Sequence, residues 1–270
     1  MPSSGDYLDV GSGTGELLWL VQAHYPFRSF GCDYTDKLLS IPGPRIDTVD
    51  LNRQSLPYND QRFALVTCVE TIEHLENHRA VIREIYRVLQ PGGVAVFSTP
   101  NVLNLRSRLR YLSSGFYNLF GPLAADESDI HTTRGHINPV SWFYLSHALL
   151  GAGFCDLKVT VDKYQRRSLL AFPFLIVPLR SASWIVYHHD KNTYETLDER
   201  NAWVVRAMNS SKLLPGRTLI VTAVKPCNVP LVQCMNRVAS IKIIATESVK
   251  FAIAKTDSKL SLFVWIAGKR

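Results

Sequence analysis

The chain has 270 residues, of which 46% are apolar and 20% charged, a balance that excludes a disordered protein and suits one large domain with appendages. Its net charge of +7 is uneven, because residues 227–270 carry seven basic and two acidic side chains and the first 226 residues contribute only +2. A basic balance that comes mostly from the tail is poor support for nucleic-acid binding, and we expect none.

Five cysteines are scattered along the chain with no CxxC and no His/Cys ligand spacing. This pattern predicts reduced thiols and no zinc site. The N-terminus has no basic segment followed by an apolar run, so we expect no signal peptide and a cytoplasmic protein.

The first informative stretch is Tyr7–Leu18, YLDVGSGTGELL. It predicts a buried strand, a glycine turn and a helix of about Glu16–His24, an arrangement that sets bare backbone N–H groups and a positive helix end beside one ligand. Gly11 and Gly13 can take positive φ and let a ligand approach closely. An ordinary glycine turn between a strand and a helix is the alternative.

The spacing of this turn is GxGxG, whereas a dinucleotide fingerprint needs GxGxxG and therefore a glycine where Glu16 stands. Asp9, two residues before the first glycine, also disfavours a phosphate ligand. Its carboxylate suits a cationic group, held directly or through water. The turn is therefore a poor cradle for a pyrophosphate.

Two further short strands are predicted over Ser29–Asp33 and Ile46–Asp50, with a short helix around Lys37–Ser40 capped by Thr35 or Asp36. An acid at the tip of the second strand of a βαβ unit is where a ribose diol is held, which is the role we expect for Asp33. The alternative is a turn carboxylate.

The continuous apolar run Phe63–Cys68 predicts a strand that is covered on both faces. A helix with its apolar face at Val81–Leu89 follows, and Val94–Thr99 predicts a fifth strand. After a long excursion, 102–138, come a helix at Pro139–Gly151 and a strand at Phe154–Asp162. A second insertion, 163–216, precedes a last strand at Arg217–Lys225.

Five strand–helix units followed by two strands predict an α/β protein with a Rossmann-like, doubly wound sheet of seven strands. The sheet is expected to be mostly parallel with an antiparallel last strand. We expect residues 1–225 to form this domain with its two insertions, and 226–270 to be a basic C-terminal extension.

Three motifs stand in order in this frame: Asp9–Gly15 (DVGSGTG), Glu70–Leu75 (ETIEHL) and the LxPGGx pattern at Leu89–Val94. With the acid at Asp33, they resemble the class I S-adenosylmethionine (SAM) methyltransferases of the small-molecule type. The resemblance implies a ligand without phosphate that carries an ammonium and a sulfonium, which suits Asp9. The family usually has a helix before the first strand, whereas only Met1–Asp6 precede it here, as in a truncated N-terminus.

The resemblance implies that SAM is held at the carboxyl ends of the first four strands. Asp50 is expected at the adenine amino group and Leu51 at the ring through its backbone N–H. The cofactor-binding residues implied are Asp9, Gly11, Ser12, Gly13, Gly15, Asp33, Tyr34, Asp50, Leu51, Val69 and Glu70.

Methyl transfer from a sulfonium is an in-line displacement, in which the protein aligns the reacting atoms and excludes water. A general base helps where the acceptor is a hydroxyl. The candidates are Glu73, His74 and His136, with His131 weaker, and bracing of a loop or of the substrate insertion is the alternative for each histidine. No metal cluster is visible in the spacing, so we expect no bound metal.

The acceptor class is left open between a small molecule, a glycan and a lipid-linked intermediate. The apolar stretch 168–187 and the basic tail suit peripheral membrane contact, with a buried subdomain core or dimer contact as the alternative. Arginines at 106–110 suit a phosphate-bearing acceptor or form a solvated helix face. Two rival functions are a non-catalytic SAM-fold binding protein and a nicotinamide-dependent oxidoreductase.

Overall fold

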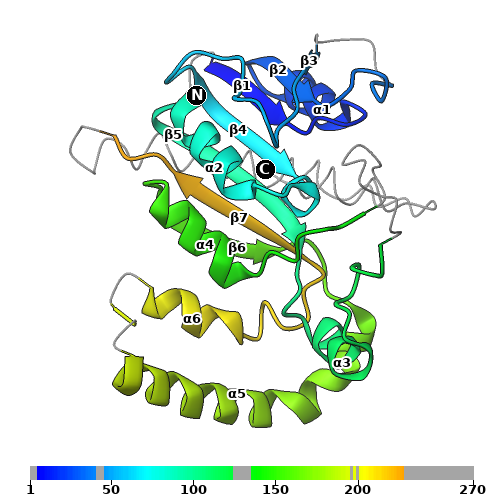
Figure 1. Cartoon of the computed structure of the whole chain (residues 1–270), viewed down its shortest axis with the longest axis vertical. Coiled ribbons are helices and arrows are strands. Elements are labelled where there is room, and N and C mark those ends of the chain that lie inside the picture. Colours follow the sequence, from blue (N-terminus) through cyan, green and yellow to red (C-terminus); the bar gives the residue numbers. More distant parts are fainter. Residues whose placement is uncertain (1–4, 41–45, 124–134, 195–196, 199–200, 228–270) are drawn as a thin grey trace, which may run out of the picture.

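The computed structural model describes residues 5–40, 46–123, 135–194, 197–198 and 201–227. Its centre is a seven-stranded sheet in the order β3-β2-β1-β4-β5-β7-β6 (Figure 1). The strands are β1 (Gly5–Val10), β2 (Phe27–Asp33), β3 (Ile46–Thr48), β4 (Phe63–Val69), β5 (Leu89–Pro100), β6 (Cys155–Val161) and β7 (Thr218–Val224). The helices are α1 (Glu16–His24), α2 (His78–Val88), α3 (Leu105–Ser114), α4 (Trp142–Gly151), α5 (Arg166–Tyr194) and α6 (Ala202–Met208), with a 3₁₀ turn η1 (Ile72–His74).

The predicted topology is confirmed. Strands β1 to β5 pair in parallel, and β7 is antiparallel to both β5 and β6. The chain moves outward from β1 to β3 and then returns to the other side of β1 at β4. This reversal makes the carboxyl edge between β1 and β4 the place where an open α/β sheet binds its ligand.

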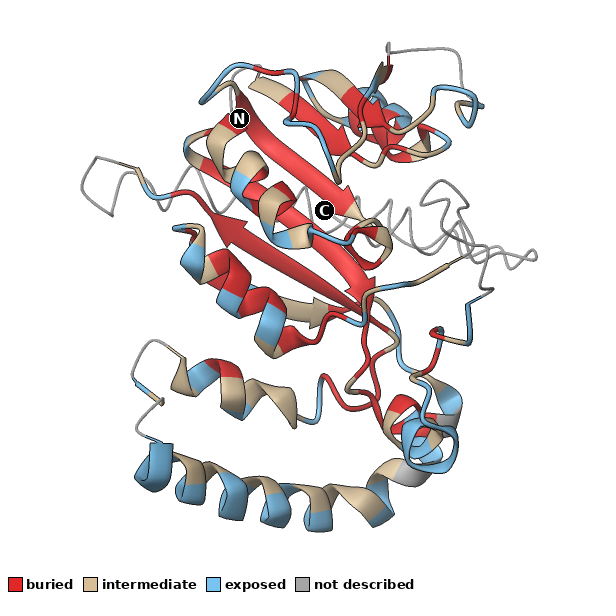
Figure 2. Cartoon of the chain, viewed as in Figure 1, coloured by how far each residue is buried: buried red, intermediate tan, exposed pale blue. Residues whose placement is uncertain are grey.

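The sheet divides the core into two layers, because successive strand residues point to opposite faces. Tyr7 of β1 packs with Leu18 and Val21 of α1, whereas its neighbour Leu8 packs with the layer that holds α2 and α4. Strand β4 is buried along nearly its whole length, as its continuous apolar run predicted. Figure 2 shows this burial concentrated in the sheet.

The structure corrects several local predictions. Residues 37 and 38 form a turn and 39 and 40 are irregular, instead of a short helix, and α4 begins at Trp142, three residues later than predicted, with Ser141 at its N-cap. Cys32, Cys68 and Cys155 are reduced, as expected, but Cys227 is disulfide-bonded. A lack of CxxC spacing does not exclude a disulfide between cysteines at other spacings. Nearly all of the predicted basic extension lies outside the described residues.

The second insertion is built around α5, a helix of 29 residues with Pro173 and Pro178 inside it. It lies apart from the sheet in Figure 1, and the side chain of Asn209 beyond α6 donates a hydrogen bond to Ser183 Oγ. Much of α5 is exposed, including Phe174 at 80%. Within the described ranges, α5 included, we find no helix whose length and hydropathy would let it cross a membrane.

Candidate active site

The glycine turn after β1 has the backbone that its sequence predicts. Gly11, Gly13 and Gly15 have φ of 73°, 51° and 81°, in the left-handed region that favours glycine. A Cβ at Gly11 would lie 2.3 Å from Thr71 Oγ1, whereas a Cβ at Gly13 would meet no atom within 4 Å. The turn therefore packs tightly against the β4 side and is open at Gly13, where a ligand can lie against the chain.

The predicted bare N–H groups are largely engaged within the turn. The Cys32 carbonyl accepts from the N–H groups of Gly11 and Ser12, and the Gly13 N–H donates to Asp33 Oδ2 at 2.7 Å. This part of the expectation is wrong, because the end of β2 lies close enough to satisfy the turn. The turn therefore offers a ligand an open backbone surface at Gly13, and few free N–H donors. Such a surface suits a ligand without phosphate.

Asp33 stands at the tip of β2, as predicted. Its Oδ1 accepts from the backbone N–H of Tyr34 and its Oδ2 from that of Gly13, each at 2.7 Å. Burial raises its pKa and these N–H donors oppose the rise. The Thr35 N–H acts on the same carboxyl group, and since a carboxylate offers about four acceptor positions, room remains for a ribose hydroxyl. The turn and ribose roles are thus compatible.

Asp9 is almost completely buried on the face of the sheet that carries α1. Thr67 donates a hydrogen bond of 2.5 Å to Asp9 Oδ1, and the Tyr7 hydroxyl is 2.7 Å from Thr67 Oγ1. Burial raises the pKa of Asp9 to about 8, against the opposing effect of the Thr67 bond. A partner for this carboxyl is therefore already supplied by the protein, and its contact with a cationic ligand stays a prediction.

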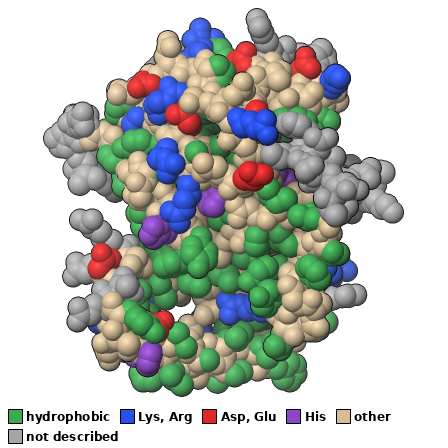
Figure 3. Space-filling model, in the orientation of Figure 1, with side chains coloured by type: hydrophobic (Ala, Val, Ile, Leu, Met, Phe, Trp, Pro, Cys, Tyr) green, Lys and Arg blue, Asp and Glu red, His purple; other side chains and the backbone are tan. Residues whose placement is uncertain are grey.

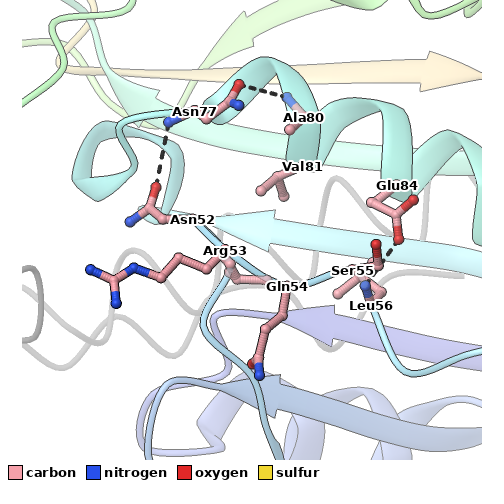
Figure 4. Close-up of a pocket in the computed structure, with 10 residues that line it drawn as sticks. Asn52, Arg53, Gln54, Ser55, Leu56, Asn77, Ala80, Val81 and Glu84 are labelled. Carbon is pink, nitrogen blue, oxygen red and sulfur yellow. Dashed lines mark hydrogen bonds between the residues drawn. The ribbon is translucent and has the colours of Figure 1, made fainter.

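The proposed adenine side is the loop after β3. Asp50 Oδ1 accepts from the Asn52 N–H at 3.0 Å, and its carboxylate lies 3.6 Å from the guanidinium of Arg53. Leu51 lines a pocket of about 260 Å³ between this loop and α2 (Figure 4). The candidate catalytic side chains do not line it, so we do not place methyl transfer there.

On the other side of the glycine turn, Val69 ends β4 and Glu70 turns the chain with a φ of 49°. The Glu70 N–H donates to Ser98 Oγ at 3.1 Å, and the Ser98 hydroxyl donates to Glu70 Oε1 at 2.9 Å. Burial raises the pKa of Glu70 to about 7, opposed by the Ser98 bond. A left-handed non-glycine residue at this point is strained, and such strain concentrates at functional sites.

The fold brings all three candidate catalytic side chains together. Glu73, His74 and His136 each have a potential ligand or base atom, and these atoms lie within 4.8 Å of one another. The two imidazole rings are 4.8 Å apart between centroids, and Phe120 packs against His136 at 5.1 Å. Linear spacing could not show this cluster, because residues 73 and 136 meet only in the fold, and the expectation of no bound metal stays an untested prediction.

A short segment, 135–138, is fastened to the loop that carries Glu73 and His74, and we call it the strap. The Glu73 carbonyl accepts from the backbone N–H groups of Ile137 and Asn138, and the Asn138 amide donates to the Leu75 carbonyl. His74 Nδ1 lies 2.8 Å from the Gly135 carbonyl. Bracing of the insertion is thus carried mainly by backbone groups.

Both histidines are held in the neutral form near neutral pH. Burial lowers the pKa of His74, and burial together with the neighbouring His74 lowers that of His136 to about 4. A carbonyl cannot donate, so the Nδ1 of His74 carries the proton and its Nε2 presents a lone pair. This lone pair suits a general base or a metal ligand. His131 lies outside the described residues.

The arginines of the first insertion differ, and one of them has a structural role that was not predicted. Arg108 turns inward, where its Nε donates to the Leu103 carbonyl at 2.7 Å and its guanidinium to Asn209 at 2.5 Å. Arg106 is exposed. Arg108 therefore ties α3 to the end of α6, and the solvated-face interpretation holds for Arg106.

The chain is similar to known methyltransferases in sequence. A methyltransferase-domain family model matches residues 1–159. The ubiquinone/menaquinone biosynthesis C-methyltransferase UbiE of Desulfotalea psychrophila is 31% identical over 171 residues, which cover 58% of this chain and 68% of the relative. The demethylmenaquinone methyltransferase of Lactobacillus johnsonii is also 31% identical, over 58% of this chain and 71% of the relative. A ubiquinone biosynthesis O-methyltransferase of Coxiella burnetii is 30% identical over 35% of this chain and 43% of that protein.

Among solved structures, a SAM-dependent methyltransferase from Archaeoglobus fulgidus matches with a TM-score of 0.49 and 16% identity, covering 82% of this chain and 86% of that one. At that distance the likeness carries no functional argument, and the family rests on the sequence matches together with the sheet order and the three motifs. The chain therefore belongs to the methyltransferase-domain family of class I SAM-dependent methyltransferases, and its cofactor is SAM.

Proposed function

We propose that this chain methylates a hydroxyl group of a small, partly apolar molecule, such as a lipid-linked aromatic intermediate. The observation that carries the proposal is the cluster of Glu73, His74 and His136 at the carboxyl edge of the sheet, in and beside the loop whose Thr71 packs against Gly11 of the glycine turn. Relatives named for quinone biosynthesis support an acceptor of this class.

The residues of the chain supply alignment and proton removal. SAM, when bound, supplies a methyl group on a good leaving group, so the main tasks of the protein are positioning and exclusion of water. The open backbone at Gly13 and the carboxylate of Asp33 would hold the cofactor. Nε2 of His74, oriented through the bond between Nδ1 and the Gly135 carbonyl, would accept the proton of the acceptor hydroxyl.

The described part of the first insertion supplies aromatic surface to the cluster through Phe120, which packs on His136 with ring centroids 5.1 Å apart. Elsewhere in this insertion the rings of Tyr111 and Tyr117 stack on each other. Aromatic surface next to two neutral imidazoles suits an acceptor with an apolar ring and an ionisable hydroxyl. A highly hydrated glycan fits this surface less well.

The test is methyl transfer from SAM labelled in its methyl group. Hydroxylated polyprenyl benzenes and naphthalenes, their short-chain analogues and a hydroxyl-rich glycan are offered in parallel, and SAM binding is measured separately by calorimetry. We expect label on the aromatic acceptors and none on the glycan. Binding of SAM without transfer to any acceptor would favour a non-catalytic SAM-fold protein, and label on the glycan alone would overturn the proposed acceptor class.

A further inference from the structure

We propose that Glu73, His74 and His136 form a binding site for one divalent first-row transition-metal ion. The potential ligand atoms of the three side chains lie within 4.8 Å of one another. Two imidazole nitrogens and one carboxylate oxygen are a donor set that such ions bind well, whereas Mg²⁺ and Ca²⁺ prefer oxygen alone.

The first support is a buried carboxyl group that the protein leaves without partners. Glu73 is 0% exposed, and neither of its oxygens has a hydrogen-bond partner. The Thr99 hydroxyl and the Glu70 side chain lie near enough to influence the pKa of this carboxyl group, but neither forms a well-aligned hydrogen bond to it, and the Thr99 hydroxyl is itself left without one. Burial of an unpaired carboxyl group is costly, and a bound cation is one of the few groups that offset that cost.

The second support is the orientation of both histidines. In metal sites, a ligating histidine almost always donates its other ring N–H to a carbonyl or carboxylate, which fixes the tautomer. His74 does so through Nδ1 to the Gly135 carbonyl at 2.8 Å, which leaves Nε2 as the ligand atom. The imidazole of His136 donates a hydrogen bond to the Leu119 carbonyl. Its buried Nδ1 has no partner and therefore presents the second lone pair for the ion.

The backbone around the cluster is strained in a way that supports a functional site. Four non-glycine residues of the described ranges have positive φ, and two of them, Glu70 and Leu119, belong to this neighbourhood. Leu119 holds His136 through its carbonyl, and the side chain of Glu70 acts on that of Glu73. Glu70 is therefore placed to support the ion as a fourth ligand or as the acceptor of a hydrogen bond from a bound water.

Binding requires a small contraction of the cluster. Ligand atoms about 2.0–2.2 Å from one ion lie roughly 3–3.5 Å from each other. The side chains of His74 and Glu73 must therefore rotate to bring the three atoms from their present spread to that distance. Three protein ligands leave coordination positions open, as catalytic metal sites do.

The chemical role of the ion rests on the proposed function. An acceptor hydroxyl that enters an open position loses its proton more readily, because the ion stabilises the oxyanion. With Nε2 of His74 bound to the ion, this imidazole no longer serves as the general base, and the proton passes to solvent or to Glu70 instead. The oxygen then forms a bond to the methyl carbon as the bond from carbon to sulfur breaks, which gives a methyl ether and neutral S-adenosylhomocysteine.

The experiment measures metal binding by itself, without SAM or acceptor, so that its failure is separate from a failure of the proposed methyl transfer. The full chain is freed of metal by dialysis against a chelator and titrated with Co²⁺ and Mn²⁺. We expect one equivalent of Co²⁺ to give visible d–d absorption, and Glu73→Gln and His136→Gln each to weaken binding more than tenfold. His24→Gln, an exposed histidine on α1, is the matched control and should bind like the wild type.

Pulsed EPR on the Mn²⁺-loaded wild type detects the nitrogen ligands of the ion directly, so this measurement does not depend on whether a variant folds. We expect nitrogen couplings from two histidines. The absence of a stoichiometric ion, the absence of nitrogen coupling, or equal binding by folded Glu73→Gln and His136→Gln variants would overturn the site. Loss of binding only in His188→Gln/His189→Gln, which changes exposed histidines of α5, would assign the ion to the surface and overturn it as well.

Discussion

The two sides of the carboxyl edge of the sheet are built in different ways. On the cofactor side, the ends of β1 and β2 meet within 25 residues of chain, and Gly13, Tyr34 and Asp33 satisfy each other through hydrogen bonds. On the acceptor side, η1 meets the strap from residues 135–138, about 60 residues further along, and the Glu73 carboxyl and His136 Nδ1 stay without partners.

The difference indicates where each side obtains its binding energy. A network that is complete before the ligand arrives is preorganised and offers shape, here the open backbone at Gly13. A buried site with unpaired donors and acceptors is unstable by itself and gains most when a proton, an ion or a substrate group completes it. Changes on the two sides should therefore affect different steps.

The largest expected effect is on turnover, from the acceptor side. His74→Ala or His136→Ala removes a group that takes a proton or holds an ion, and we expect turnover to fall by about 10²–10⁴. SAM affinity, measured by calorimetry, should stay within a few fold of wild type. His24→Ala is the control. If these variants lose SAM affinity as strongly as they lose turnover, the cofactor side and the acceptor side act as one unit and are not separate.

The next effect is on cofactor affinity, from the other side. Asp33→Ala removes the acceptor of the ribose hydroxyls, and we expect SAM binding to weaken by about 2–4 kcal/mol, since each bond to a charged group contributes about 1.5–3. Asp36→Ala, an exposed acid three residues on, is the control. A folded Asp33→Ala variant that binds SAM like the wild type would assign Asp33 to the turn alone.

The same contrast explains which parts of the protein its sequence predicts. The cofactor side follows from contiguous signals: the GxGxG turn, the apolar run of β4 and the acid at the tip of β2 each mark local structure, and the sheet order follows from them. The pairing of Glu73 with His136 does not follow, because it depends on how the chain returns after β5. The helix predicted at 37–40 failed because the cap residues Thr35 and Asp36 are equally common in turns.

Helix α5 could not be predicted either, since Pro173 and Pro178 argue against one continuous helix. Proline destabilises a helix interior most where no tertiary contact supports the helix. Here the start of the helix is anchored by the bond from the Gln165 N–H to the Pro215 carbonyl, and its second half by the bond from Asn209 to Ser183.

A third prediction concerns the pH dependence of folding on the cofactor side. The pKa of Asp9 is raised by burial from 3.8 to about 8, so between these values the folded state holds a proton that the unfolded state has lost. This contribution to stability is complete below about pH 4 and is lost as the pH rises through 8. Asp9→Asn cannot ionise and keeps the acceptor for Thr67, so it should remove this part of the pH dependence.

Urea unfolding of the two proteins at pH 5 and pH 7 measures the effect. A full single-proton difference corresponds to about 1.4 kcal/mol per pH unit, so over these two units we expect the wild type to lose roughly 2.5 kcal/mol more than Asp9→Asn. Asp36→Asn, which changes an exposed acid, should follow the wild type. Parallel curves for wild type and Asp9→Asn would show that Asp9 is ionised in the fold and free to meet a cationic group.

The smallest expected effect tests whether the acceptor side extends to a membrane surface. Leu170, Phe174 and Trp184 of α5 are 64–80% exposed, and Figure 3 shows apolar side chains along the edge that α5 forms. By contrast, the apolar residues of α2 are buried against the sheet. An exposed helix with large apolar residues binds lipid interfaces in proportion to the apolar area it buries.

We therefore expect the protein to co-sediment with anionic vesicles at low salt, where the attraction of its basic tail is strongest. Leu170→Ser with Phe174→Ser should lower the partition coefficient about tenfold, because two large apolar side chains no longer enter the interface. Leu112→Ser on α3, which changes a residue that is 85% exposed, is the matched control. The opposite outcome is a wild type that stays in the supernatant and elutes as a dimer, with a double variant that elutes as a monomer. In that case α5 is a subunit contact, and a lipid-linked acceptor must reach the cluster without help from this helix.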